Sequence, residues 1–72
     1  MGIQKDFGIA VRRHRDKLGL SQEEFAEKAS LHRTYVSDIE LGKVDVGIRV
    51  SEKIAKALGL SLSKLIKEAE SP

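Results

Sequence analysis

The chain has 72 residues, no cysteine and a single proline, and its 13 basic and 11 acidic side chains leave a formal net charge of +2. A chain this short buries only about 60% of its unfolded surface, so we expect one small domain over residues 1–72 that gains from helix packing or self-association. The composition excludes disulfides, a catalytic thiol and a membrane-spanning segment, and it suits a mature cytoplasmic protein.

Apolar residues at helical spacing predict a first helix over residues 6–18. Phe7 and Val11 lie four positions apart and therefore share one face of that helix. Asp6 is placed to cap the start of the helix, and Gly19 is placed to end it.

A second helix of about nine residues is predicted after Ser21. Ser21 and Glu24 have the spacing of a capping box, in which each side chain accepts a hydrogen bond from the other residue's backbone N–H. Phe25, Ala26 and Ala29 form the apolar face. A helix this short is unstable alone in water, so it must pack against its neighbours.

Only a three- or four-residue turn separates this helix from the next, which starts near His32. So short a turn makes the two helices cross steeply, as in a helix-turn-helix unit. Ala26 is small enough to let the helices approach closely. We expect Ser30 to turn the chain through a left-handed backbone conformation, which suits glycine best and costs serine about 1 kcal/mol.

The third helix is expected within LHRTYVSDIE, residues 31–40, and its two sides differ. Val36 and Ile39 are expected to dock the helix on the core, and Glu40 places a carboxylate right beside Ile39. The other side carries polar residues with no evident structural role, namely Arg33, Thr34, Ser37 and Asp38. Their pattern alone leaves open whether this side is simply solvated or reads a ligand.

Two further helices complete the pattern. Gly47 begins the fourth, whose apolar residues are Ile48, Ile54, Ala55 and Leu58. The segment LGLS occurs at residues 18–21 and again at 58–61, and each copy joins a glycine stop to a serine cap. A fifth helix is expected over residues 61–69. The sequence therefore predicts an all-α chain of five helices.

The segment LSQEEFAEKASLHRTYVSDIELGK, residues 20–43, resembles the helix-turn-helix of the phage repressor and Cro type, also called the Xre type. Shared features are LSQ at the start of the second helix, Ala26, the apolar pair of the third helix and E-x-G-K at the end. KIAKALGLSLSKLI, residues 53–66, resembles the last two helices of that family. The resemblance implies a lambda-repressor-like DNA-binding domain with its motif at residues 21–41. HRTYVSDIE is further similar to controller proteins of restriction–modification systems.

In that family the second helix of the motif lies in the major groove, and its first residues contact base edges. The resemblance assigns base contacts to Arg33, Thr34 and Ser37. Arginine can donate two hydrogen bonds to O6 and N7 of guanine, and threonine can bond a base edge or touch a thymine methyl. The resemblance assigns phosphate contacts to Ser21, Gln22, His32, Tyr35, Lys43 and Arg49. Structural roles stay open for Ser21 and His32 as helix caps and for Tyr35 as a packing residue.

The resemblance also implies an ion pair between Arg15, late in the first helix, and Glu40 at the end of the recognition helix. A half-buried carboxylate is costly unless it is paired, which accounts for Glu40 beside an apolar residue. Asp38 and Leu41 depart from the family pattern. A carboxylate at position 38 repels phosphates unless it accepts a hydrogen bond from a cytosine amino group.

One recognition helix reads only a few base pairs, and the usual solution is a two-fold dimer with half-sites about 34–36 Å apart. Relatives of the controller type dimerise through the fifth helix. We therefore expect a dimer interface made by Leu62, Leu65, Ile66 and Ala69, with Leu65 and Ile66 at its centre. The alternative is that Leu62 and Leu65 complete the core of a monomer.

These features predict a sequence-specific transcriptional regulator that binds double-stranded DNA as a homodimer on a palindromic operator, and that blocks or contacts RNA polymerase. The alternative is a helical interaction module, such as an antitoxin, whose main partner is a protein. An enzyme is not expected, since His14 and His32 lack metal-ligand spacing and no glycine-rich phosphate loop occurs. No cofactor, metal or small-molecule ligand is expected.

Overall fold

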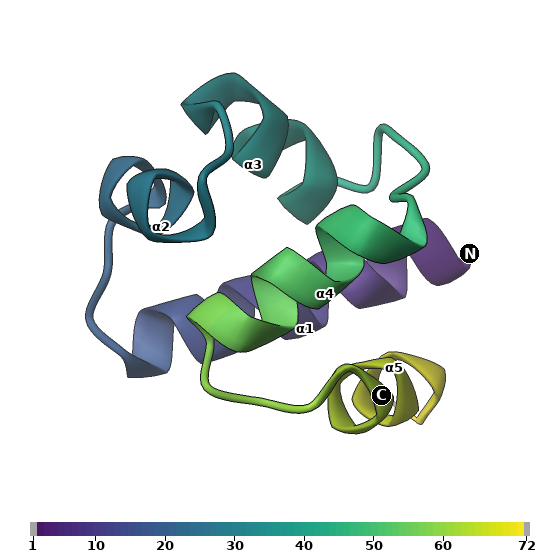
Figure 1. Cartoon of the computed structure of the whole chain (residues 1–72). Coiled ribbons are helices and arrows are strands. Elements are labelled where there is room, and N and C mark those ends of the chain that lie inside the picture. Colours follow the sequence, from purple (N-terminus) through teal and green to yellow (C-terminus); the bar gives the residue numbers. More distant parts are fainter. Residues whose placement is uncertain (1, 72) are drawn as a thin grey trace.

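The computed structural model describes residues 2–71, so Met1 and Pro72 lie outside the described part of the chain. The described residues form helices and no strand (Figure 1). In chain order the helices are α1 (Ile3–Lys17), α2 (Gln22–Ala29), α3 (Arg33–Glu40), α4 (Ile48–Ala57) and α5 (Leu62–Glu70). The prediction of an all-α, five-helix fold is confirmed. Within residues 2–71, no helix is long and apolar enough to cross a membrane.

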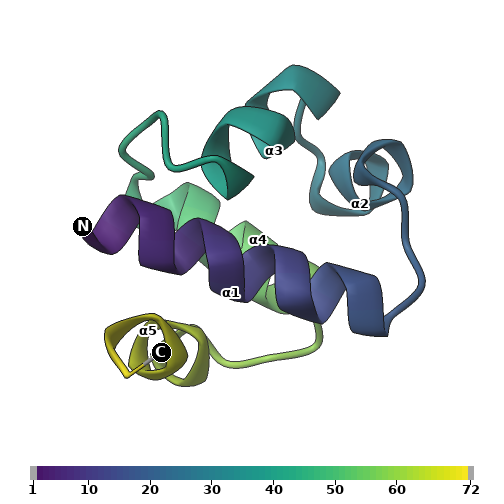
Figure 2. The same ribbon diagram turned by 180° about the vertical axis from the view of Figure 1, so that it is seen from behind.

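Helix α1 contacts both α3 and α5. Figures 1 and 2 show α2 and α3 together on one side of α1 and α5 on the opposite side. Each helix contributes at least one large, fully buried side chain to the core between them, and α3 contributes two: Val11, Phe25, Val36, Ile39, Ile54 and Leu65. The core is thus shared by all five helices, and α3 is held against it at one edge.

Helix α1 begins earlier than the sequence pattern predicts. Gly2 is its N-cap and makes no side-chain cap, and its carbonyl accepts hydrogen bonds from the backbone N–H of Lys5 at 3.1 Å and of Asp6 at 3.2 Å. Asp6 as the capping residue is therefore wrong. Its carboxylate lies in the first turn instead, where it complements the positive end of the helix dipole.

The predicted capping box and left-handed turn are confirmed. The Ser21 hydroxyl accepts a hydrogen bond from the Glu24 N–H at 3.0 Å, and the Glu24 carboxylate accepts one from the Ser21 N–H at 2.9 Å. These bonds hold the pKa of Glu24 below its usual range. Ser30 ends α2 with φ 57° and ψ 43°, in the left-handed region. This turn sets the steep crossing of α2 and α3.

Gly8 lies at a close approach between α1 and α3, and the sequence pattern did not indicate it. A Cβ atom on Gly8 would lie 2.6 Å from the carbonyl oxygen of Glu40 and 2.8 Å from its carbonyl carbon. Real Cβ atoms do not come so close to backbone. The glycine inside α1 therefore lets the C-terminal end of α3 sit directly on that helix.

Helix α5 is fastened to α1 by a polar contact as well as by its apolar face. The His14 Nε2 atom lies 2.7 Å from the Glu68 carboxylate, with side chains 15% and 29% exposed. An ionised carboxylate only accepts hydrogen bonds, so the imidazole donates. This bond holds the pKa of Glu68 below its usual range.

Candidate nucleic-acid interface

Helix α3 has an inner and an outer side, as expected. Val36 and Ile39 are each 1% exposed and dock the helix on the core. Arg33 and Thr34 at its N-terminal end are exposed, whereas the other two polar residues, Ser37 and Asp38, are half-buried. The helix therefore presents its first turn outward.

His32 caps this first turn. Its Nδ1 atom accepts a hydrogen bond from the Thr34 backbone N–H at 3.2 Å. With Nδ1 as acceptor, Nε2 carries the proton of the neutral imidazole and is free to donate. The structural role left open by the sequence is thus present, and a donor remains for an external group.

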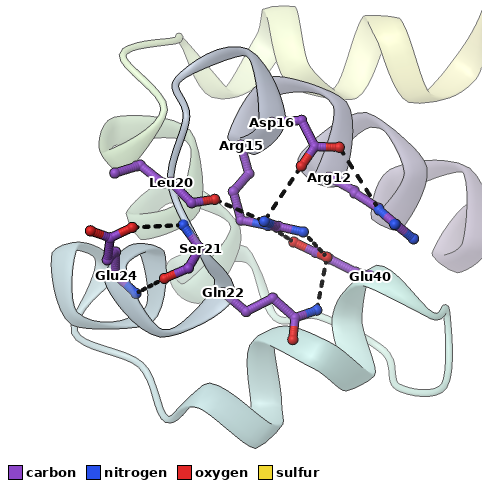
Figure 3. A network of polar contacts seen from close by, with 8 residues as sticks. All are labelled: Arg12, Arg15, Asp16, Leu20, Ser21, Gln22, Glu24 and Glu40. Atoms are coloured by element: carbon purple, nitrogen blue, oxygen red, sulfur yellow. Dashed lines mark hydrogen bonds and ion pairs between the residues drawn. The ribbon is translucent and has the colours of Figure 1, made fainter.

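The other end of α3 is fixed by two charges. Arg15 Nε donates to Glu40 Oε2 at 2.7 Å, and Arg15 NH2 donates to Glu40 Oε1 at 3.0 Å (Figure 3). The side chains are 10% and 3% exposed. Arg15 NH1 also donates to the Leu20 carbonyl at 2.8 Å. The bond to Glu40 raises the pKa of Arg15, which keeps the guanidinium charged.

Gln22 joins the same network from the first turn of α2. Its side-chain amide donates to Glu40 Oε1 at 3.1 Å, so α1, α2 and α3 all meet at one carboxylate (Figure 3). A glutamine amide has two N–H donors, and the second remains for another acceptor. The orientation of α3 relative to α2 is therefore set by hydrogen bonds as well as by apolar packing.

The structure brings some of the predicted contact residues together and leaves others apart. Ser21, Gln22 and Arg33 line one shallow hollow with Arg15 and Glu23. Lys43 and Arg49 are exposed beyond the opposite end of α3, on either side of the loop that leads to α4. Tyr35 is half-buried and packs against the core cluster. The predicted contacts thus fall into two groups, one near each end of α3.

Glu23 was missed by sequence reasoning. Its Oε2 atom lies 4.0 Å from Arg33 NH1, and the two side chains are 80% and 66% exposed. The signal in the sequence is an acidic residue in the first turn of the helix that precedes a steep crossing. That crossing brings the start of α2 beside the start of α3.

Two of the four predicted interface residues on α5 are wrong. Leu65 is fully buried and Ala69 is 1% exposed, and both belong to the core of the single chain. Side chains with almost no exposed surface cannot meet a second copy. Leu62 and Ile66 are only partly buried and pack at the edge of that core, so they remain available. The most exposed large apolar side chain of the described residues is Ile48, 78% exposed at the start of α4.

Helices α2 and α3 cross steeply and are joined by a tight turn, and α3 is held to α1 by the Arg15–Glu40 ion pair. This arrangement defines a helix-turn-helix protein. The helix-turn-helix family model matches residues 11–65, which is more than half of the chain and includes the whole crossed pair. This chain belongs to the Xre-type helix-turn-helix family of DNA-binding regulators.

Several similar proteins are control proteins. The control protein C.BamHI of Bacillus amyloliquefaciens is 48% identical over 61 residues, which cover 83% of this chain and 75% of that protein. C.MunI of a Mycoplasma species is 45% identical over 69 residues, covering 94% and 93%. The restriction–modification controller protein C.Esp1396I, solved as a tetramer with its natural 35 base-pair operator, is 31% identical with a TM-score of 0.83, covering 97% of each chain.

Proposed function

We propose that this chain is the controller protein of a restriction–modification system, a cytoplasmic homodimer that binds a palindromic operator through α3. The observation that carries the proposal is the division of α3 into a fixed end and a presented end. Glu40 is latched to Arg15, and Arg33 and Thr34 stand exposed. The similarity to control proteins, one solved on its operator, supports the same conclusion. On a promoter, such a dimer blocks or contacts RNA polymerase.

The exposed first turn of α3 suits base readout. Arg33 has the reach and the paired donors for O6 and N7 of guanine, and Thr34 beside it can bond a base edge or touch a thymine methyl. Ser37, one turn further along the same helix, is assigned the third base contact. The cap at His32 matters here, because a frayed first turn would leave these side chains without fixed positions.

Phosphate contacts would set the register of the helix in the groove. Ser21 and Gln22 flank Arg33 in the same hollow, and each keeps a donor after its internal bond, a hydroxyl hydrogen and a second amide hydrogen. Lys43 and Arg49 supply cations near the other end of α3. His32 and Tyr35 have Nε2–H and hydroxyl donors, respectively, for the same purpose.

The dimer is expected to form through the partly exposed residues of α5. Leu62 and Ile66 lie at the edge of the core and keep apolar surface outside it. We expect Ile66→Glu to leave the helix content unchanged and to shift the chain toward monomer in sedimentation experiments. It should also weaken binding to a two-half-site operator more than binding to a single half-site.

The decisive experiment is a comparison of Arg33→Ala with the wild-type chain on DNA selected by the wild type from a randomised pool. A bidentate guanine contact corresponds to about 5- to 150-fold discrimination, so affinity for the selected site should fall by a factor in that range. Affinity for scrambled DNA should change far less. Lys67→Ala, which removes one positive charge from α5 on the far side of α1, should leave the ratio of the two affinities unchanged.

Other outcomes would redirect the proposal. An equal loss on all sequences would assign Arg33 to a phosphate. Tight binding to the product of a neighbouring gene, without any DNA binding, would support the antitoxin alternative. A methyltransferase or restriction endonuclease gene beside the coding sequence would support the controller function.

A further inference from the structure

The exposed pair of Glu23 and Arg33 lies at the place where base readout is proposed. Both residues line the hollow between the starts of α2 and α3, and the contact runs from Arg33 NH1 to Glu23 Oε2 at 4.0 Å. Glu23 is the wrong sign for a residue that approaches phosphates. Its position beside the leading base reader calls for a role other than backbone contact.

The chemistry of the guanidinium shows what such a contact leaves free. NH1 is one corner of the planar group, and Nε with NH2 form the side edge that donates two parallel hydrogen bonds. Arg15 in this protein uses its guanidinium in that way. NH1 donates to the Leu20 carbonyl and lies 3.5 Å from the Asp16 carboxylate, and Nε and NH2 donate to the two oxygens of Glu40.

With NH1 of Arg33 facing Glu23, the Nε–NH2 edge of Arg33, unlike that of Arg15, has no partner among residues 2–71. The O6 and N7 atoms of guanine form a pair of acceptors that this edge fits. Arg33 thus resembles Arg15 in having a carboxylate near NH1, but its Nε–NH2 edge is open at the position where Arg15 binds Glu40 and where a base could bind Arg33.

We propose that Glu23 is a positioning residue that sets the base specificity of Arg33. The proposal rests on the proposed function, because it requires Arg33 to read a guanine. Glu23 restrains an exposed, rotamer-rich side chain in the orientation that meets a base edge. The negative charge of Glu23 also repels DNA phosphates on every sequence. This repulsion is offset only on sequences where Arg33 makes its guanine contact.

The size of the effect follows from the exposure of the pair. Exposed ion pairs contribute modestly, equivalent to about 1.4- to 5-fold in an equilibrium constant. We therefore expect Glu23→Gln to weaken binding to the selected site by about 2- to 5-fold. On scrambled DNA the loss of a negative charge near phosphates should leave affinity unchanged or tighten it. The specificity ratio should therefore fall by about 2- to 5-fold if affinity for scrambled DNA is unchanged, and by more if that affinity rises.

The matched control is Glu27→Gln. Glu27 is exposed on the same helix, one turn later, and the structure records no ion pair for it among residues 2–71. This variant makes the same charge change, so it should shift the affinities for selected and scrambled DNA by the same factor. Both variants keep the Ser21–Glu24 capping box, and their melting temperatures should match that of the wild type.

The test is completed in an Arg33→Ala background and with a modified base. Glu23→Gln should no longer change the specificity ratio once Arg33 is absent. 7-Deazaguanine lacks the N7 acceptor, and its use at the guanine that Arg33 reads should cost the wild type more affinity than the Glu23→Gln variant. If Glu23→Gln changes both affinities by one common factor, as Glu27→Gln does, Glu23 is only a repulsive charge and the proposal fails. If Arg33→Ala keeps full discrimination, the assigned base contact fails first, and the role of Glu23 with it.

Discussion

This protein has two arginine–glutamate pairs that line or adjoin the same hollow. The two pairs have the same charged groups but differ in contact distance and in burial. Arg15 and Glu40 make two hydrogen bonds, at 2.7 and 3.0 Å, with side chains 10% and 3% exposed. Arg33 and Glu23 make one contact at 4.0 Å, with side chains 66% and 80% exposed. The inner pair joins α1 to the end of α3, and the outer pair stands at the start of α3.

Burial, and not the identity of the partners, therefore decides what each ion pair does. In water the attraction between two charges is largely offset by lost hydration and side-chain freedom. In a buried site each charge has lost its water and depends on its partner. The inner pair is therefore able to fix the orientation of α3, whereas the outer arginine keeps its Nε–NH2 edge available for the proposed base contact.

We expect the greatest change from Glu40→Ala, which breaks the inner pair on one side only. Arg15 would then remain buried without its carboxylate, and such a change costs roughly 3–5 kcal/mol. Chemical denaturation should show this loss. Affinity for the selected DNA should fall as well, because the ion pair that fixes the orientation of α3 is broken. Glu23→Ala, the same change in the outer pair, should alter the free energy of unfolding by no more than about 0.5 kcal/mol.

A double variant makes this test stricter. Replacing both members, as in Arg15→Met with Glu40→Leu, removes both buried charges together and should recover much of the lost stability. If Glu40→Ala leaves the melting temperature unchanged, the inner pair does not hold the fold, and the contrast between the two pairs disappears.

The next change in size is expected for Gly8→Ala, which pushes α3 away from α1 without touching a charge. The added Cβ would meet the backbone of Glu40 at 2.6 to 2.8 Å, and overpacking of this kind costs about 1–3 kcal/mol. Alanine is otherwise favoured over glycine inside a helix by about 1 kcal/mol. The sign of the change in unfolding free energy shows which of the two effects is larger. Stabilisation would mean that α1 and α3 can accommodate a Cβ atom at position 8, which would contradict a close contact there.

Much of the fold could be predicted because its signals are local. The capping box needs only Ser21 and Glu24 at their spacing, and the left-handed turn needs only a short connection ending at Ser30. The docking of α3 needs the spacing of Val36 and Ile39. Each of these depends on a few adjacent residues, so a single sequence contains the whole signal.

The missed features depend on contacts between distant segments. Gly8 reads as an ordinary, weakly unfavourable residue of a helix until the backbone of Glu40 is placed against it. Periodicity marks Leu65 and Ala69 as apolar, but it cannot say whether their face meets α1 or a second chain. The partner of Arg33 likewise depends on the crossing angle of α2 and α3. Tertiary geometry, and not helix propensity, decides all three.

A smaller change in the free energy of unfolding is expected for substitutions of Ser30, which lies in the turn between α2 and α3. Ser30 adopts φ 57°, which costs a residue with a Cβ about 1 kcal/mol or more, and the greater unfolded-state freedom of glycine offsets part of the gain from replacing it. Ser30→Gly should therefore raise the free energy of unfolding by up to about 1 kcal/mol. Ser30→Ala retains the Cβ and should give no such gain. Loss of stability in Ser30→Gly would show that the serine side chain has a role of its own.

The smallest change in stability is expected for a third acid–base pair, His14 and Glu68. The burial of this pair lies between that of the inner pair and that of the outer pair. His14 donates to Glu68 at 2.7 Å with side chains 15% and 29% exposed, and this bond keeps the pKa of Glu68 below its usual range. A carboxyl group with a lowered folded-state pKa stabilises the fold above its unfolded pKa, about 4.3, and that contribution is lost as the pH falls through and below this value. Urea denaturation between about pH 6 and pH 3 should therefore show a shallower loss of stability for Glu68→Gln than for the wild type. Glu70→Gln on the same helix should follow the wild-type curve. If Glu68→Gln also follows the wild-type curve, the His14–Glu68 contact adds no more to stability than the exposed pair of Arg33 and Glu23. In that case only the inner pair contributes measurably to the free energy of unfolding.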